Sequence, residues 1–205
     1  MMRISHFSPA ALALLLACSP RAETAAAPKV ERAEGVVTRI SASEISLSEA
    51  GGKTETITLR PGWTVAVSRP ISIDQIKPGS YLGTTNHAGP DATGRSTEVH
   101  LSPNGIKGPG LDFVMDPVAD TTMTNGTVVT VATTAGGQVL KIDYGSGVRT
   151  VTVPPGTPLV LNTPGSQDLV KVGQTVRVIK FTPAGGGEAR QFITVGENGA
   201  PPPPA

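Results

Sequence analysis

Aromatic side chains are scarce in this chain of 205 residues, which contains four Phe, two Tyr and one Trp. An excess of charge of one sign is also missing, because 17 Lys and Arg residues are balanced by 16 Asp and Glu residues. A formal net charge of +1 creates no field that attracts nucleic acid or anionic lipid. The apolar run at residues 10–17 is too short to span a bilayer, which excludes a channel-forming transporter.

The N-terminus has the features of an export signal. Arg3 precedes the apolar run and small residues end it, which is typical of a secretory signal peptide. Residues 15–18, Leu-Leu-Ala-Cys, resemble a bacterial lipobox, in which the cysteine becomes the first mature residue and carries acyl chains. Cys18 is the only cysteine in the chain and has no partner for a disulfide. We therefore expect a signal peptide at residues 1–17 and lipid attachment at Cys18.

This anchor predicts where the protein is located. Acyl chains hold a protein on a membrane without spanning it. Ser19 follows the cysteine, and in the Gram-negative lipoproteins that this pattern resembles, a residue other than aspartate there favours the outer membrane. We expect a cell-envelope protein on the periplasmic face of the outer membrane. The alternative is ordinary cleavage near the alanines at 25–27, which would release a soluble periplasmic protein, although Pro28 disfavours that cut.

The chain contains an internal repeat. A shift of 94 residues places residues 57–79 on residues 151–173 with eight identities in 23 positions, among them Gly79 on Gly173. Upstream the shift falls to 91, which places residues 34–37 on residues 125–128. A change of three residues in one turn is a tolerated difference between copies.

Each repeat reads as short strands around one helical turn. Alternation of apolar and polar residues predicts strands at 36–40, 45–47, 57–59 and 65–67, a turn at 72–79, and strands at 81–85 and 96–101. The second repeat predicts the same elements at 129–131, 140–142, 151–153, 159–161, 166–173, 176–178 and 193–195. Ser72 is expected to cap the first turn, and Gly79 and Gly173 are expected to end the turns in a left-handed conformation.

This order predicts an all-β fold of two tandem small OB-like barrels, with open sheets or a sandwich as the alternative. The expected boundaries are a lipid-anchored tether at 18–33, a first barrel at 34–101, an irregular connector at 102–124, a second barrel at 125–196 and a Pro-rich tail at 197–205. Substituting Gly79 or Gly173 is expected to destabilise its own barrel only.

The repeated motifs also carry a family resemblance. Gly35-Val36-Val37 at the start, residues 74–79 and 168–173 before a strand, and residues 97–101 at the end resemble the bacterial DUF5666 domain, twice. The longer arrangement is similar to exported proteobacterial proteins often labelled metal ABC transporter permeases, and the similarity covers nearly all of residues 34–200. The resemblance implies architecture and no particular activity.

Catalytic equipment is sparse, so we expect no enzyme, no catalytic residue and no cofactor. His87 and His100 are the histidines of the mature part, and His100 is expected to be a solvated strand residue. A metal site needs several converging ligands, and no such motif is present. His87, Asp91 and Glu98 are weak candidates for a loose cation site.

Aromatic residues at 63, 81, 144, 181 and 192 are scattered in the sequence, which disfavours a nucleic-acid surface. Trp63 is expected to plug a barrel end. The apolar connector residues Leu111, Phe113, Val114 and Met115 follow no repeat, so they predict either a partner interface or a cap on a barrel.

Together these features predict a non-catalytic cell-envelope lipoprotein that acts as a binding or scaffolding module for an envelope protein or polymer. The alternative is a periplasmic metal- or solute-binding accessory protein of a transporter.

Overall fold

The structure, a computed structural model, describes residues 28–116 and 119–204. Its strands are β1 (Lys29–Ile40), β2 (Glu44–Ser48), β3 (Thr54–Thr58), β4 (Thr64–Pro70), β5 (Tyr81–Ala88), β6 (Thr93–Leu101), β7 (Leu111–Asp116), β8 (Thr121–Thr134), β9 (Gly137–Asp143), β10 (Val148–Val153), β11 (Leu159–Gly165), β12 (Thr175–Thr182) and β13 (Arg190–Gly196). Four short 3₁₀ turns are η1 (Ile73–Gln75), η2 (Gln167–Leu169), η3 (Ala184–Gly186) and η4 (Glu197–Gly199). The predicted all-β, barrel-like fold is confirmed.

The repeated turns have the predicted backbone but a different cap. Gly79 and Gly173 both have φ of 90°, a left-handed value that glycine adopts without a steric penalty. Ser72 stands before η1 with an extended backbone, but its side chain makes no capping hydrogen bond. The turn is instead held from its other end, where the Ser80 hydroxyl accepts a hydrogen bond from the amide of Lys77.

Strands β8, β9, β10, β6 and β5 form a closed barrel, which we call barrel two. Neighbouring strands pair antiparallel except β10 and β6, whose parallel pairing closes the barrel. The order is compatible with an OB-type barrel. Its core consists of aliphatic side chains that are almost fully buried, such as Leu82, Val99, Leu140, Ile142 and Val151.

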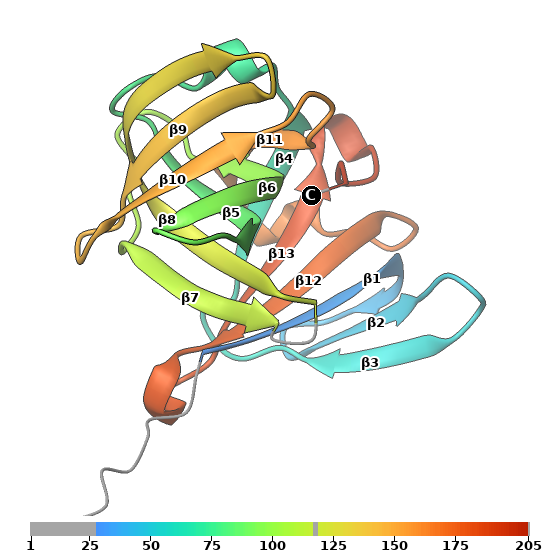
Figure 1. Cartoon of the computed structure of the whole chain (residues 1–205). Coiled ribbons are helices and arrows are strands. Elements are labelled where there is room, and N and C mark those ends of the chain that lie inside the picture. Colours follow the sequence, from blue (N-terminus) through green and yellow to red (C-terminus); the bar gives the residue numbers. More distant parts are fainter. Residues whose placement is uncertain (1–27, 117–118, 205) are drawn as a thin grey trace, which may run out of the picture.

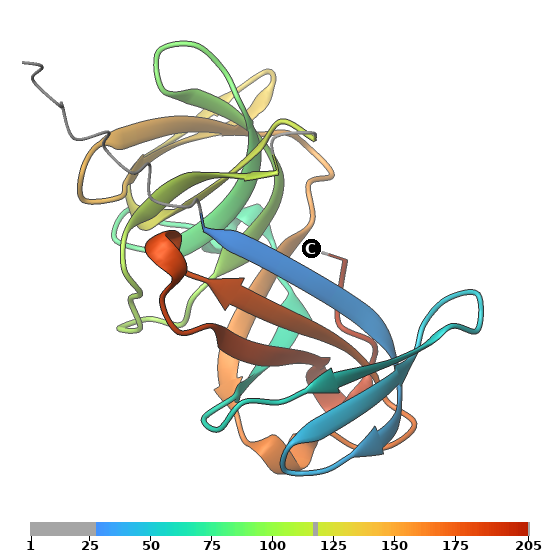
Figure 2. The same cartoon turned by 90° about the horizontal axis from the view of Figure 1, so that it is seen from below.

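The two repeats exchange strands. Barrel two takes β5 and β6 from the first repeat and β8 to β10 from the second. Barrel one, formed by β1, β2, β3, β12 and β13, has a core in which Val37 and Leu47 of the first repeat pack with Val176 and Ile193 of the second. The colours show the exchange, since the blue strands lie with the red ones (Figure 1) and β1 runs beside β12 (Figure 2). The expectation that residues 34–101 and 125–196 form separate barrels is therefore wrong.

Strands β4 and β11 carry each repeat from one barrel to the other. They pair antiparallel around Ser68 and Asn162, two positions that the 94-residue shift places on each other, so this pair marks a pseudo-twofold axis. β4 also runs parallel to β13, and β11 runs parallel to β6, which joins the barrels in one sheet. Exchange of strands between the repeats costs little free energy, because a strand finds nearly the same contacts in either copy.

Each repeated turn docks on the first strand of the other repeat. The Gly79 amide donates to the Val128 carbonyl at 2.8 Å, and the Gly173 amide donates to the Val37 carbonyl at 2.8 Å. Ile76, just after η1, belongs to the core of barrel two, whereas Val170, just after η2, belongs to the core of barrel one. The turns therefore lock the exchange in place.

Barrel one differs from barrel two at its seam. Among the described residues, β3 has β2 as its only strand partner. The buried side chain of Gln191 on β13 bridges this seam: its Oε1 accepts from the Arg60 amide at 2.7 Å, and its Nε2 donates to the Thr58 carbonyl at 2.9 Å. A side chain thus replaces the backbone pairing that closes barrel two.

Three predicted boundaries change. The expected tether overlaps β1, which already begins at Lys29. The expected irregular connector contains β7, which pairs with β8. The Pro-rich tail packs on barrel one, because Pro202 is buried and Arg177 donates to the Pro203 carbonyl at 3.3 Å. Within residues 28–116 and 119–204, no helical segment has the length and apolar character that a membrane span requires.

Candidate functional site

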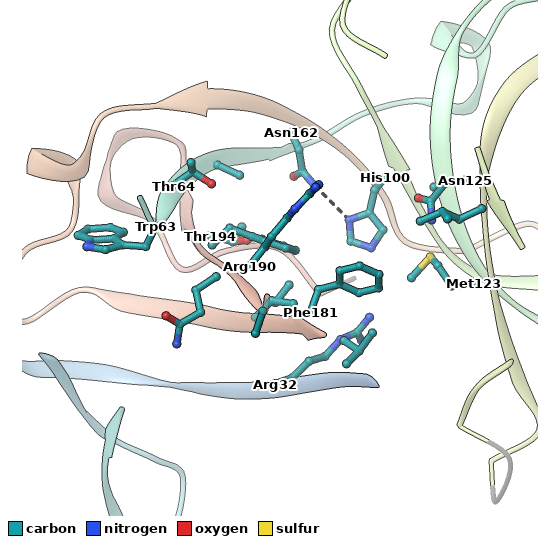
Figure 3. A pocket seen from close by; sticks show the side chains of 18 of the residues that line it. Arg32, Trp63, Thr64, His100, Met123, Asn125, Asn162, Phe181, Arg190 and Thr194 are labelled. Carbon is teal, nitrogen blue, oxygen red and sulfur yellow. Dashed lines mark hydrogen bonds between the residues drawn. The ribbon is translucent and has the colours of Figure 1, made fainter. Parts of the chain in front are cut away.

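A cleft of about 810 Å³ lies between the two barrels. β1, β12 and β13 contribute to its wall on the side of barrel one, and β5 to β8 contribute on the other side. Residues of the crossover strands β4 and β11 also line it, so the strand exchange builds the site. Figure 3 shows the interior, with Phe181, Arg32 and Arg190 from barrel one and Met123 and Asn125 from β8.

The scarce aromatic residues gather in this cleft. Five of the seven in the chain line it, namely Trp63, Tyr81, Phe113, Phe181 and Phe192. The rings of Phe113 and Phe181 face each other across the cleft with centroids 6.0 Å apart and planes inclined by 53°. Residues that are scattered in the sequence are therefore neighbours in the structure. Trp63, at 6% exposure, is part of the core of barrel one, whereas the other four are half-buried.

One feature of the sequence distinguishes these aromatic residues. None of those within the repeats is aromatic in the other copy: Trp63 corresponds to Thr157, Tyr81 to Thr175, Phe181 to His87 and Phe192 to Glu98. Phe113 lies in the connector between the repeats. Trp63 belongs to the core of barrel one, but Tyr81, Phe181 and Phe192 belong to neither barrel core. For these three residues, the departure from the repeat marks the cleft.

His100 lies in the cleft and is not the solvated residue that the sequence predicted. Its side chain is 22% exposed. One ring nitrogen, Nδ1, lies 3.2 Å from the Asn162 amide nitrogen, and the other, Nε2, lies 3.4 Å from the Glu98 carboxylate. The two contacts hold the ring in one orientation, and the hydrogen bond to Asn162 spans from β6 to β11 (Figure 3).

Glu98 is a buried carboxylate with three partners. The Thr85 hydroxyl donates to its Oε1, Arg32 binds the same oxygen at 3.0 Å, and His100 lies on the cleft side. Burial alone raises the pKa of Glu98, but the hydrogen bonds from His100 and Thr85 and the charge of Arg32 outweigh it and lower the pKa from 4.5 to about 2. Glu98 therefore ties barrel two to β1 of barrel one.

This pKa predicts how stability depends on pH. Because the folded pKa lies below the unfolded value, the stabilisation is complete above pH 4.5 and is lost as the pH falls towards 2. We expect Glu98→Gln to reduce the change in unfolding free energy between these pH values by about 2–3 kcal/mol. Urea denaturation at several pH values measures this difference. Lys180 and Lys29 also lower the pKa of Glu31 to about 2. Glu31 is present in both the parent and the Glu98→Gln variant, so its contribution cancels in the difference between their pH profiles. Parallel pH profiles would contradict the assignment.

The weak metal candidates do not form a ligand set. Glu98 is occupied by Thr85, Arg32 and His100. His87 is exposed near the end of β5, where its Nδ1 lies 3.1 Å from the Asp120 carbonyl, and Asp91 lies in the turn after β5. Within the described part of the chain, no three His, Cys, Asp or Glu side chains converge.

The four apolar connector residues belong to β7 and divide between its faces. Leu111 and Phe113 line the cleft, and the Met115 sulfur accepts a contact from Arg32 at 3.9 Å. Val114 points away and is 54% exposed. β7 is therefore a wall of the cleft. Its other face is held by Asp112, which forms a bidentate ion pair with Arg149 of β10 at 2.8 and 2.6 Å.

Comparison with known proteins adds no relative. No family model matches the chain, and neither the curated proteins nor the solved structures contain a match. The predicted lipid-attachment residue, Cys18, lies outside the described residues.

Proposed function

We propose that this chain is a non-catalytic, lipid-anchored binding protein of the cell envelope, and that its ligand occupies the cleft between the barrels. The observation that carries the proposal is the gathering of five of the seven aromatic residues in one cavity. Aromatic side chains supply large contact area at low cost in conformational entropy, which suits a binding surface.

Size and exposure support binding rather than packing. Sites for small molecules range over about 300–1,000 Å³ and are mostly apolar with a few placed polar groups. The cleft, at about 810 Å³, falls within this range. Tyr81, Phe113, Phe181 and Phe192 are only half-buried, so part of each ring is open to contact. His100 and Asn162 add polar groups to the same lining.

The same geometry disfavours acid–base catalysis. A nucleophile needs a base within hydrogen-bond reach. Both ring nitrogens of His100 are occupied, one by Asn162 and one by Glu98, and within the described residues no hydroxyl or thiol bonds to the ring. The arrangement orients the imidazole as a fixed polar group of the cleft wall.

A solute-binding accessory protein of a transporter is the second candidate, and the cleft itself favours it over a scaffold for a large partner. A cleft of about 810 Å³ between two barrels accepts a molecule of limited size, whereas a scaffold needs an extended surface. Both candidates use the same site and differ in what receives the ligand after binding.

Binding of a neutral aromatic dye tests the proposal. We expect N-phenyl-1-naphthylamine to bind with one site per chain to the mature protein, residues 18–205, prepared unacylated as Cys18→Ser. Phe113→Ala should weaken binding about fivefold, because it removes one wall of the aromatic contact. Val114→Ala on the outward face of β7 is the matched control and should bind as the parent does. Equal affinities in the two variants, with equal melting temperatures, would remove the cleft as the site.

The anchor is tested separately. Radiolabelled palmitate should enter the full-length protein in cells and should be absent from the Cys18→Ser variant, whose precursor should keep its signal peptide. A parent protein that is processed and released without label would show a soluble periplasmic protein instead.

A further inference from the structure

The charged side chains of the cleft are not all neutralised. Arg32, Arg60, Arg177 and Arg190 line it, and Glu188 is the one carboxylate among the described lining residues. Two of these arginines have acidic partners. Arg32 binds Glu98 at 3.0 Å, and the nearly buried Arg177 binds Glu34 at 2.8 Å.

Arg60 and Arg190 remain available. Within the part of the chain that the structure describes, no carboxylate forms an ion pair with either guanidinium. Their backbones are held close together, because the Gln191 side chain accepts a hydrogen bond from the amide of Arg60 at 2.7 Å. The seam of barrel one thus places two cationic side chains on one wall of the cleft.

Arg190 is directed into the cleft. Figure 3 shows its side chain extending towards Asn162 and His100, beside Phe181. A guanidinium offers a planar set of donors that match a carboxylate, sulfonate or phosphate in two hydrogen bonds. Arg60 and Arg190 are exposed, so the acidic group of a ligand can reach both guanidinium groups, and aromatic rings line the same cleft.

We infer that the ligand is an amphipathic organic anion, whose acidic group is bound by Arg190 and Arg60 while its apolar body lies against Phe113, Phe181 and Phe192. This inference rests on the proposed function and adds the chemical class of the ligand. The volume of the cleft, about 810 Å³, suits a single small molecule and not a polyanion. The nearly balanced charge of the chain agrees with this choice. Glu188, in the turn between β12 and β13, is exposed and can offset only one of the two positive charges of Arg60 and Arg190. The lining of the cleft therefore keeps an excess of positive charge.

Two dyes with the same aromatic body test the charge. 1-Anilinonaphthalene-8-sulfonate differs from N-phenyl-1-naphthylamine by its sulfonate, so the ratio of the two affinities isolates the anionic group. In the unacylated mature chain we expect the sulfonate to bind about tenfold more tightly. Arg190→Gln should lower its affinity about tenfold, and Arg60→Gln should lower it in the same direction. Binding of the neutral dye should change less than twofold in both variants.

Arg39→Gln is the matched control. It removes the same charge from an exposed strand position outside the cleft and should leave both dyes unaffected. Equal loss of sulfonate binding in Arg39→Gln and Arg190→Gln would overturn the inference, because net charge alone would explain it. Equal affinity of the parent for both dyes would also overturn it and leave the proposed function standing. Failure of both dyes to bind would remove the proposed function as well.

Discussion

Gly126→Val is expected to lower the melting temperature of both barrels together, by about 10 °C, in a single transition. Gly126 lies on β8, in barrel two. If the repeats folded separately, its substitution would leave barrel one unchanged. The two barrels belong to one continuous sheet, because β4 and β11 pair with each other and also with β13 of barrel one and β6 of barrel two. Arg32 of β1 also binds Glu98 of β6, so unfolding of barrel two removes contacts that stabilise barrel one.

The reason for a large effect is the close approach of β8 to β9. A Cβ at Gly126 would overlap the Asp143 carbonyl oxygen and lie 2.8 Å from Cγ2 of Ile142. A clash with backbone cannot be relieved by a rotamer change, so the strands must separate at a cost of about 3 kcal/mol. At Gly35, the equivalent position of the first repeat, an added Cβ would likewise lie only 2.6 Å from the Ser48 carbonyl oxygen.

The single tryptophan makes the measurement specific. Trp63 lies in the core of barrel one, so its fluorescence reports on the barrel that does not contain the substitution. Thermal melts followed by Trp63 fluorescence and by circular dichroism should shift by the same amount. Gly136→Val, in the exposed turn after β8, is the control, since a Cβ there meets only the Thr134 hydroxyl at 3.8 Å. An unshifted Trp63 transition in Gly126→Val would show independent barrels.

Asp112→Ala is expected to destabilise the protein by about 2–3 kcal/mol, because it leaves a half-buried guanidinium without its counter-ion. The side chains of Asp112 and Arg149 are 13% and 12% exposed. Asp112 also accepts from the Thr124 hydroxyl at 2.6 Å, and Arg149 donates to the Thr93 carbonyl at 2.9 Å. The pair joins β7, β8, β6 and β10 around one end of barrel two.

Urea denaturation compares this variant with a double variant. Replacing both partners by apolar residues of similar size, Asp112→Leu with Arg149→Met, removes the unpaired charge and should recover most of the lost stability. Glu31→Ala removes the exposed partner of Lys180 and should have little effect, since exposed ion pairs contribute little. Equal losses for the single and double variants would show that packing, and not charge, is what Asp112 provides.

Only part of the cleft could be predicted from the sequence. The apolar residues Leu111, Phe113, Val114 and Met115 predict a partner interface or a barrel cap, and the strand that contains them, β7, forms a wall of the cleft. The strand is not evident from the sequence because Val114, which is 54% exposed on the outer face, is apolar at a position where period-two alternation expects a polar residue. His100 was expected to face solvent for a similar reason: the alternation with Val99 and Leu101 indicates which face is outside one barrel, but not that a second barrel covers that face.

By itself, the sequence determined the local structure of this protein. Period-two alternation specified the strands of each repeat, and Gly79 and Gly173 specified the turns, because both signals depend on neighbours along the chain. Only the tertiary structure decided which copy each strand joins. The two repeats present nearly the same edges and core residues, so pairing within or between copies satisfies the same pattern, and the path of β4 and β11 selects exchange. The cleft follows from that choice, since its aromatic and arginine residues come from strands that only the exchange brings together.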